Sequence, residues 1–131
     1  MLKFTYTENG FNLERLASSV DELVARRVVL AMRVGEGIVV EPTSASFLLP
    51  ADLPGLKGLE TQARRDRNEA IALCIADADY VEVSLHGTWI AANSETAEGV
   101  FVTAIGELSE FYLIDLWEQA QTKISLLEEV D

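Results

Sequence analysis

The feature that most constrains the fold is a change of hydrophobic period near Gly106. From Glu107 to about Glu129, apolar residues recur at helical spacing, and neither glycine nor proline interrupts them. Before Gly106 the apolar segments are short, rich in β-branched and aromatic residues, and separated by glycine, proline or asparagine. The sequence therefore predicts short strands followed by one long C-terminal helix. The residues of that helix that we expect to be buried are Leu113, Leu116, Trp117, Ala120 and Ile124.

A second helix is predicted at about residues 53–67, where Leu56, Leu59 and Ala63 have helical spacing. Strands and helices do not alternate regularly along the chain, which disfavours a parallel α/β sheet. We therefore expect a single α+β domain over residues 1–131. Its core would be a mostly antiparallel sheet of about six to eight short strands, with the helices near 53–67 and 107–129 packed on it.

The segment from Ser19 to Leu49 allows two interpretations. Ser18 or Ser19 is suited to cap a helix that could continue to Arg33. The β-branched run before Gly35 favours instead a short helix followed by a strand and a hairpin. Pro42 cannot serve a central strand, so residues 41–46 are expected to separate that hairpin from an edge strand at 47–49. Residues 70–75 are predicted to be a buried strand.

A β-hairpin is predicted over residues 77–98, with His86-Gly87 as its turn. Apolar and polar residues alternate over 81–85, and residues 88–92 would form the returning strand. Pairing about this turn would place Asp77 opposite Thr96 and Asp79 opposite Ser94. Carboxylates gathered at one hairpin end repel one another unless a cation, a base or water intervenes.

Calcium fits such a cluster, because Ca²⁺ takes about six to eight oxygen ligands in a tolerant geometry. The spacing is not that of an EF-hand, which needs a twelve-residue loop between two helices. Ser94 and Thr96 could add further oxygens. The predicted metal ligands are Asp77, Asp79, Asn93, Glu95 and Glu98.

The negative charge of the chain lies entirely in its second half. The net charge is −12, and residues 1–67 hold nine acids and nine Lys or Arg. Residues 68–131 hold thirteen acids and a single base, Lys123. Such a surface repels nucleic acid and anionic lipid and attracts cations or basic partners. It is also a common means of solubility, so the charge alone does not identify a ligand.

Other chemical motifs carry little weight. Cys74 lies in an apolar segment without a nucleophile motif, and one cysteine with one histidine, His86, is too few for a zinc site. The glycine spacing fits no phosphate-binding loop. Arg64, Arg65 and Arg67 are more typical of a solvated helix end than of a nucleic-acid contact. The final EEVD matches a chaperone docking tail over four residues only, and we treat it as coincidence.

The expected compartment is the cytoplasm. No apolar run approaches the roughly 18 residues that span a bilayer, and the start of the chain does not resemble a signal peptide. A single cysteine cannot form an internal disulfide. We expect no membrane and no nucleic-acid partner.

Three segments resemble small acidic proteins of cyanobacteria. These are Leu2 to Glu8, Ala45 to Pro50, and Glu98 to Thr103. That group includes a heterocyst-associated calcium-binding protein without EF-hands, which is thought to buffer calcium. The resemblance implies Ca²⁺ binding in a bacterial cytoplasm, without assigning ligands.

The function expected from the sequence is therefore an acidic calcium-binding protein with a buffering or regulatory role, and not an enzyme. One alternative is an acidic regulatory module that docks a basic partner protein without metal, which would associate in a salt-sensitive way. A second alternative is a carboxylate-based enzyme, which would require a recessed pocket and a strongly raised carboxyl pKa.

Overall fold

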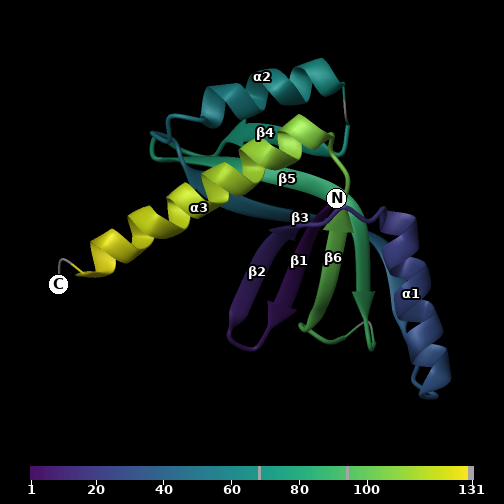
Figure 1. Cartoon of the computed structure of the whole chain (residues 1–131). Coiled ribbons are helices and arrows are strands. Elements are labelled where there is room, and N and C mark those ends of the chain that lie inside the picture. The colour runs from purple at the N-terminus through teal and green to yellow at the C-terminus, as the bar shows by residue number, and fades with distance from the viewer. Residues whose placement is uncertain (68, 94, 130–131) are drawn as a thin grey trace. The chain divides into compact units, whose positions relative to one another are not determined.

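The structure, a computed structural model, describes residues 1–67, 69–93 and 95–129, and side chains as far as Thr122. It confirms the α+β class, with a mostly antiparallel six-stranded sheet in the order β2-β1-β6-β5-β3 and with β4 paired to β5 (Figure 1). The described chain has three helices rather than the two main ones expected. The elements are β1 (Leu2–Thr7), β2 (Gly10–Arg15), α1 (Val20–Arg33), β3 (Val39–Pro50), α2 (Leu56–Asp66), β4 (Ile71–Ile75), β5 (Tyr80–Ala91), β6 (Gly99–Thr103) and α3 (Glu107–Glu129).

The chain divides into two compact units. Unit 1 comprises Met1–Ala45 and Leu85–Ala104, and unit 2 comprises Ser46–Ser84 and Ile105–Asp131. Two of the three boundaries fall inside β3 and β5, so each of these two long strands supplies residues to both units.

In unit 1 the alternation of side chains along the strands separates an aliphatic face from an aromatic face. Val100 and Val102 of β6 pack with Leu23 of α1 in a buried cluster, which also contains Met1 and Ile90. Phe101, between the two valines, points to the other face, where it meets Phe4 edge-on with ring centroids 5.5 Å apart. Because side chains alternate between the two faces of a strand, α1 covers the aliphatic face of the sheet in unit 1.

β1 and β2 form the first hairpin. β1 and β2 pair antiparallel, with Leu2 opposite Arg15 and Thr7 opposite Gly10, so that residues 8 and 9 form the turn. Gly10 has a φ of 125°, a conformation that favours glycine. β1 also pairs with β6, with Phe4 opposite Phe101.

The prediction of a strand at 27–34 is wrong, because α1 continues without a break from Val20 to Arg33. Its first turn is capped by Ser19, whose hydroxyl oxygen accepts a hydrogen bond from the backbone N–H of Glu22 at 3.2 Å. The helix ends before Gly35, where φ is 71°. The modest helix penalty of valine is outweighed by the cap and by burial of Leu23.

The segment around Pro42 also differs from expectation. Residues 39–50 form one strand, β3, instead of two strands separated by a polar step. β3 stands at the edge of the sheet order. An edge strand has one side without ladder hydrogen bonds, so the missing N–H of proline is tolerated there.

In unit 2, α2 and α3 pack closely through glycine. A Cβ on Gly55 would lie 3.0 Å from Leu116 Cδ2, and one on Gly58 would lie 2.8 Å from Tyr112 Cε1. Burial of Leu113, Leu116 and Ala120 is confirmed. Trp117 is only partly buried, with its ring edge-on to Phe47 at a centroid distance of 6.0 Å. The Ile124 side chain lies outside the described residues, as do Val130 and Asp131 of the EEVD tail.

A polar contact joins the end of α2 to the start of α3. The Ser109 hydroxyl, which is fully buried, donates to Asp66 Oδ2 at 2.5 Å. Gln62 Nε2 donates to the other carboxylate oxygen of Asp66 at 2.9 Å. The carboxylate therefore accepts one hydrogen bond from each helix, which fixes the two helices to each other.

The prediction that residues 70–75 form a buried strand is correct for the strand and wrong for the burial. Ile71 is buried, whereas Cys74 and Ile75 are exposed.

Among the described helices, none is both long and apolar enough to cross a bilayer.

Candidate functional site

The hairpin that would have gathered the carboxylates does not exist. β5 runs straight through His86 and Gly87 to Ala91. It pairs antiparallel with β6, with Thr88 opposite Val102 and Ile90 opposite Val100. The chain therefore reverses after residue 91, not at residue 86. Gly87 is needed for another reason, since a Cβ there would overlap the carbonyl oxygen of Val102.

Asp77 and Asp79 precede β5 and belong to unit 2. The Asp77 carboxylate accepts two backbone hydrogen bonds through Oδ1, from the N–H of Asp79 at 2.7 Å and from the N–H of Tyr80 at 2.9 Å. This is an Asx turn that shapes the entry into β5. Both acids are exposed.

Asn93, Glu95 and Glu98 follow β5 and belong to unit 1. Asn93 Oδ1 accepts from the N–H of Glu95 at 2.9 Å, again in a local turn. Glu98 Oε1 accepts from the backbone N–H of Glu8, at the tip of the first hairpin, at 3.1 Å. All three residues are exposed, and Ser94 lies outside the described residues.

The predicted ligands thus form one group before β5 and another after it, and the pairing that was to join them is wrong. In the part of the chain that the structure describes, no three or more His, Cys, Asp or Glu side chains are grouped so as to hold a metal ion. Asp77 and Asn93 make the contacts of local turns, and Glu98 accepts a hydrogen bond from the tip of the first hairpin. They supply no arrangement specific to calcium.

One pair of reactive side chains was not anticipated. Ser44 Oγ lies 2.7 Å from His86 Nδ1, across β3 and β5 in unit 1. Both residues are exposed, and activation of a serine requires the histidine to be oriented by a third group and an adjacent oxyanion site. The contact is explained as a cross-strand hydrogen bond. Cys74 is a free and exposed thiol.

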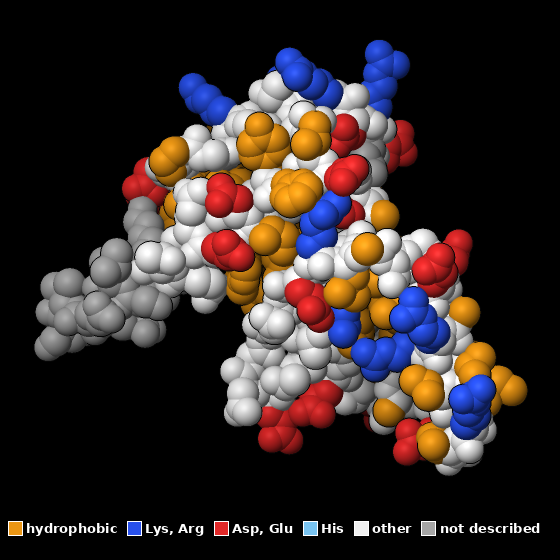
Figure 2. All heavy atoms as spheres, in the orientation of Figure 1, with side chains coloured by type: hydrophobic (Ala, Val, Ile, Leu, Met, Phe, Trp, Pro, Cys, Tyr) orange, Lys and Arg blue, Asp and Glu red, His pale blue; other side chains and the backbone are white. Residues whose placement is uncertain are grey.

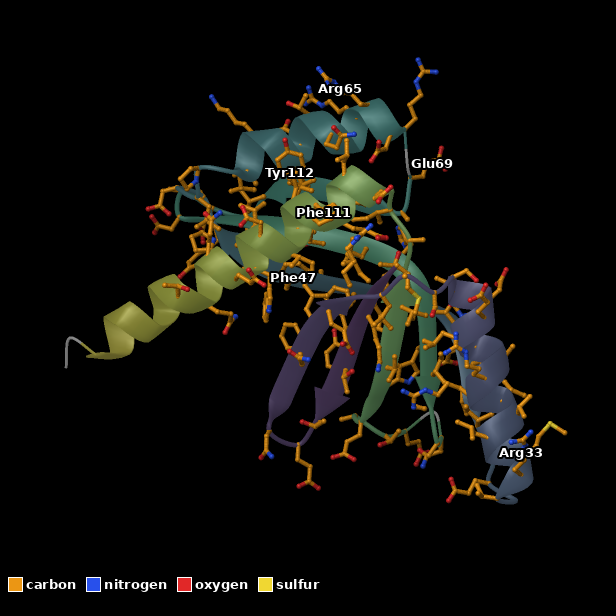
Figure 3. The ribbon with its side chains drawn as sticks, in the orientation of Figure 1. Arg33, Phe47, Arg65, Glu69, Phe111 and Tyr112 are labelled. Atoms are coloured by element: carbon orange, nitrogen blue, oxygen red, sulfur yellow. The ribbon has the colours of Figure 1, made fainter. Side chains whose placement is uncertain are left out.

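The most distinctive surface of unit 2 is an apolar face on α3. Leu108 is 55% exposed, Phe111 is 55% exposed and Tyr112 is 39% exposed. Their spacing of three and four residues places them in one stripe, which adjoins the buried stripe of Leu113 and Leu116. We call these three residues the aromatic face. Figure 2 shows apolar side chains gathered over α3, and Figure 3 labels Phe111 and Tyr112 on the turns that run beside α2.

Charges of opposite sign lie on α3 and on its neighbour α2. Along α3, the acids Glu107, Asp115 and Glu118 are exposed, whereas Glu110 is buried. On α2, against which Tyr112 packs, a shallow hollow is lined by Thr61, Arg64, Arg65 and Arg67. The aromatic face is therefore bordered by acids on its own helix, and the neighbouring helix α2 carries arginines.

The sequence did contain a signal for this face. The apolar positions of α3 include Leu108, Phe111 and Tyr112 as well as the buried stripe, and together they occupy too much of the helix circumference for one side. A helix that is apolar on two sides either lies deep in a core or presents a surface to a partner.

Comparison with known proteins gives a family and no function. A family model described as Alr0857-like matches residues 1–121. Alr0857 is a cyanobacterial protein name, which agrees with the cyanobacterial resemblance and names no activity. No curated protein and no solved structure matches the chain.

Proposed function

The chain belongs to the Alr0857-like family, and we propose that it is a non-enzymatic binding module whose aromatic face docks a basic partner protein. The observation that carries the proposal is the acid-bordered stripe of three large exposed apolar side chains on α3. Aromatic residues are enriched in the buried centres of interfaces, and an exposed apolar group with a polar border is typical of a docking site.

Charge supports a basic partner. From Glu107 to Thr122, α3 contains four acids and no lysine or arginine, and the whole excess of negative charge belongs to residues 68–131. Complementary charge speeds association and discourages partners of like charge. Nucleic acid and anionic membranes are therefore disfavoured as ligands of this face.

The borders also give the partner an orientation. Arg64 is neutralised by Glu60 at 2.7 Å, whereas Arg65 and Arg67 form no ion pair within the described part of the chain. A partner helix that lies along α3 would direct its lysines or arginines toward Asp115 and Glu118. It would direct any carboxylate toward α2. Apolar side chains spaced three and four residues apart would cover Phe111 and Leu108.

A synthetic peptide tests this docking mode. The probe is an amphipathic helix with leucines spaced three and four residues apart and lysines along one flank, and the readout is fluorescence anisotropy at 150 mM salt. We expect binding that Asp115→Lys with Glu118→Lys weakens by at least about tenfold, equivalent to about 1.4 kcal/mol. Phe111→Ser is expected to weaken binding as well. Both changes are on exposed positions, so the fold should be retained.

The matched control is Glu36→Lys with Glu41→Lys. These two acids are exposed, lie in unit 1, and change the net charge by the same amount. If this control weakens binding as much as the α3 pair does, only long-range attraction is at work and the assignment to α3 fails. Equal binding of a glutamate-flanked version of the peptide would also overturn the proposal.

Calcium binding through Asp77, Asp79, Asn93, Glu95 and Glu98 stays a prediction from the sequence. We do not propose it as the function, because the hairpin on which it depended is wrong. The carboxylate enzyme is not proposed either, since Asp77 makes the contacts of a local turn and Glu98 accepts a hydrogen bond from the tip of the first hairpin.

A further inference from the structure

α1 presents a surface whose chemistry is the complement of the aromatic face. α1 and its C-cap residue expose four large apolar residues within six positions. Leu30 is 57% exposed and Met32 is 74% exposed, and Val29 and Val34 are exposed as well. Figure 2 shows apolar and basic side chains interspersed over this helix. Exposed apolar residues this close together on one helix are unusual unless another surface covers them.

The charges on this helix are positive. From Leu23 to Val34 the sequence has three arginines and no acid, in a chain whose net charge is −12. Arg26 makes a long exposed contact with Glu22, at 3.8 Å, and donates a hydrogen bond to the exposed Ser18 hydroxyl at 3.2 Å. Arg27 and Arg33 form no ion pair within the described part of the chain. An exposed pair at that distance contributes little, so these arginines remain available to a partner.

The shape of α1 suits bulky side chains. One hollow of about 370 Å³ lies on α1. Its lining residues, which we call the basic face, are Ala25, Arg26, Val29, Leu30 and Arg33. On the other side of Leu30, a groove of about 420 Å³ separates α1 from the end of β5 and β6. Its floor includes the buried Ile90 and Val100, and its rim carries Arg27, Glu36 and Glu98. Leu30 thus forms a ridge between two apolar depressions.

The occupant that fits is apolar, bulky and acidic. An anionic membrane has the right sign for α1, but it offers no bulky rings to fill the depressions beside Leu30. The chain itself carries the complementary surface, namely the aromatic face with Asp115 and Glu118 beside it. Its rings match the depressions beside Leu30, and its carboxylates match Arg26 and Arg33.

We propose that the basic face of α1 docks on the aromatic face of a second copy of this chain. The inference rests on the proposed function, in which the aromatic face is a docking surface. It adds that a second copy of the chain competes with the basic partner protein for that surface. A second copy would cover the surface that a basic partner protein needs, so self-association and partner binding exclude each other. Local ion pairs at a few ångströms persist at 150 mM salt, whereas the repulsion between net charges is screened beyond about 8 Å.

Charge reversal tests the contact. The first variant reverses α1, with Arg26→Glu and Arg33→Glu, and the second reverses α3, with Asp115→Lys and Glu118→Lys. Sedimentation equilibrium of the full chain between micromolar and millimolar concentration, at 150 mM salt, measures the mass. We expect the wild type to self-associate and each variant alone to weaken association by at least tenfold. An equimolar mixture of the two variants should associate again, because each retains the face that the other needs.

The outcomes are distinguishable. A wild type that is monomeric at millimolar concentration overturns the inference, and so does association that neither reversal weakens or that mixing does not restore. Circular dichroism checks the folding of each variant, and Arg26→Gln with Arg33→Gln replaces the α1 variant if glutamate disturbs the helix. If the wild type is monomeric but still binds the lysine-flanked peptide through α3, this inference fails and the proposed function stands.

Discussion

Gly87 shows how one residue can be misread from the sequence. The pair His86-Gly87 between two alternating segments is typical of a hairpin turn. In the structure residue 87 lies inside β5. It is a glycine there because the backbone of β6 approaches too closely to leave room for a side chain. The same residue type serves turns and close backbone contacts, and only the partner strand distinguishes the two.

We therefore predict that Gly87→Ala destabilises the protein by about 1–3 kcal/mol or more, because the added Cβ overlaps the carbonyl oxygen of Val102. Gly37→Ala is the control, since a Cβ there meets nothing within 4 Å. Urea denaturation measures both free energies of unfolding. A nearly neutral Gly87→Ala would contradict the close approach of β6 to residue 87.

Tyr6 provides a pH-dependent test at the residue scale. Its ring meets Trp89 edge-on at 5.7 Å and stacks with Phe11 at 5.4 Å, and burial raises the pKa of the Tyr6 hydroxyl above its usual value of 10.0. The folded state therefore holds the proton more tightly than the unfolded state does.

It follows that the contribution of Tyr6 to stability is complete below pH 10. That contribution is lost as the pH rises from the unfolded pKa through the higher folded one. We expect the free energy of unfolding to fall less between pH 9 and pH 11 in Tyr6→Phe than in the wild type. Guanidinium denaturation at both pH values measures the difference. An equal fall in both proteins would show that Tyr6 ionises as freely in the folded state as in the unfolded one.

At the scale of elements, periodicity succeeded where a segment has one unbroken pattern. α3 begins and ends where the helical spacing begins and ends, and α2 lies inside the predicted range. It failed for α1, where valines suggested a strand, and for β3, where Pro42 suggested an interruption. In both cases tertiary contacts determined the secondary structure. Burial of Leu23 stabilises α1 as a helix, and the position of β3 at the sheet edge allows the strand to continue through Pro42.

The two sides of α3 lead to opposite predictions. Leu116 is fully buried and packs against Gly55 of α2, so Leu116→Ala should cost about 2–5 kcal/mol. Leu108 is exposed, so Leu108→Ala should change stability by less than about 0.5 kcal/mol. Thermal melts of both variants check the difference. A large loss for Leu108→Ala would mean that the aromatic face is part of a core and not a docking surface.

The candidate site was less predictable than the fold, because it depends on which side of a correctly predicted helix is covered. The acids named as metal ligands were expected at the open end of one hairpin, but the structure places them before and after β5. For the whole molecule this has a direct consequence for calcium. We expect millimolar Ca²⁺ to leave the melting temperature unchanged in the wild type and in Asp77→Asn with Asp79→Asn. A rise in the wild type that the double variant lacks would restore the calcium hypothesis.

The division into two units raises the question of whether they unfold together. β3 and β5 each supply residues to both units, so neither unit keeps its full set of strands when the other unfolds. This argues for one cooperative transition, as the single domain predicted from the sequence requires.

The two tryptophans allow that prediction to be tested, because Trp89 lies in unit 1 and Trp117 lies in unit 2. Trp117→Phe leaves a fluorescent reporter for unit 1, and Trp89→Phe leaves one for unit 2. We expect each variant to give a fluorescence transition that coincides with its own far-ultraviolet circular dichroism transition in urea. Tyr6 and Phe47 lie edge-on to the two indoles, so both signals should change on unfolding. A fluorescence midpoint that departs from the circular dichroism midpoint in either variant would show that one unit unfolds alone, and β3 and β5 would then couple the units only weakly.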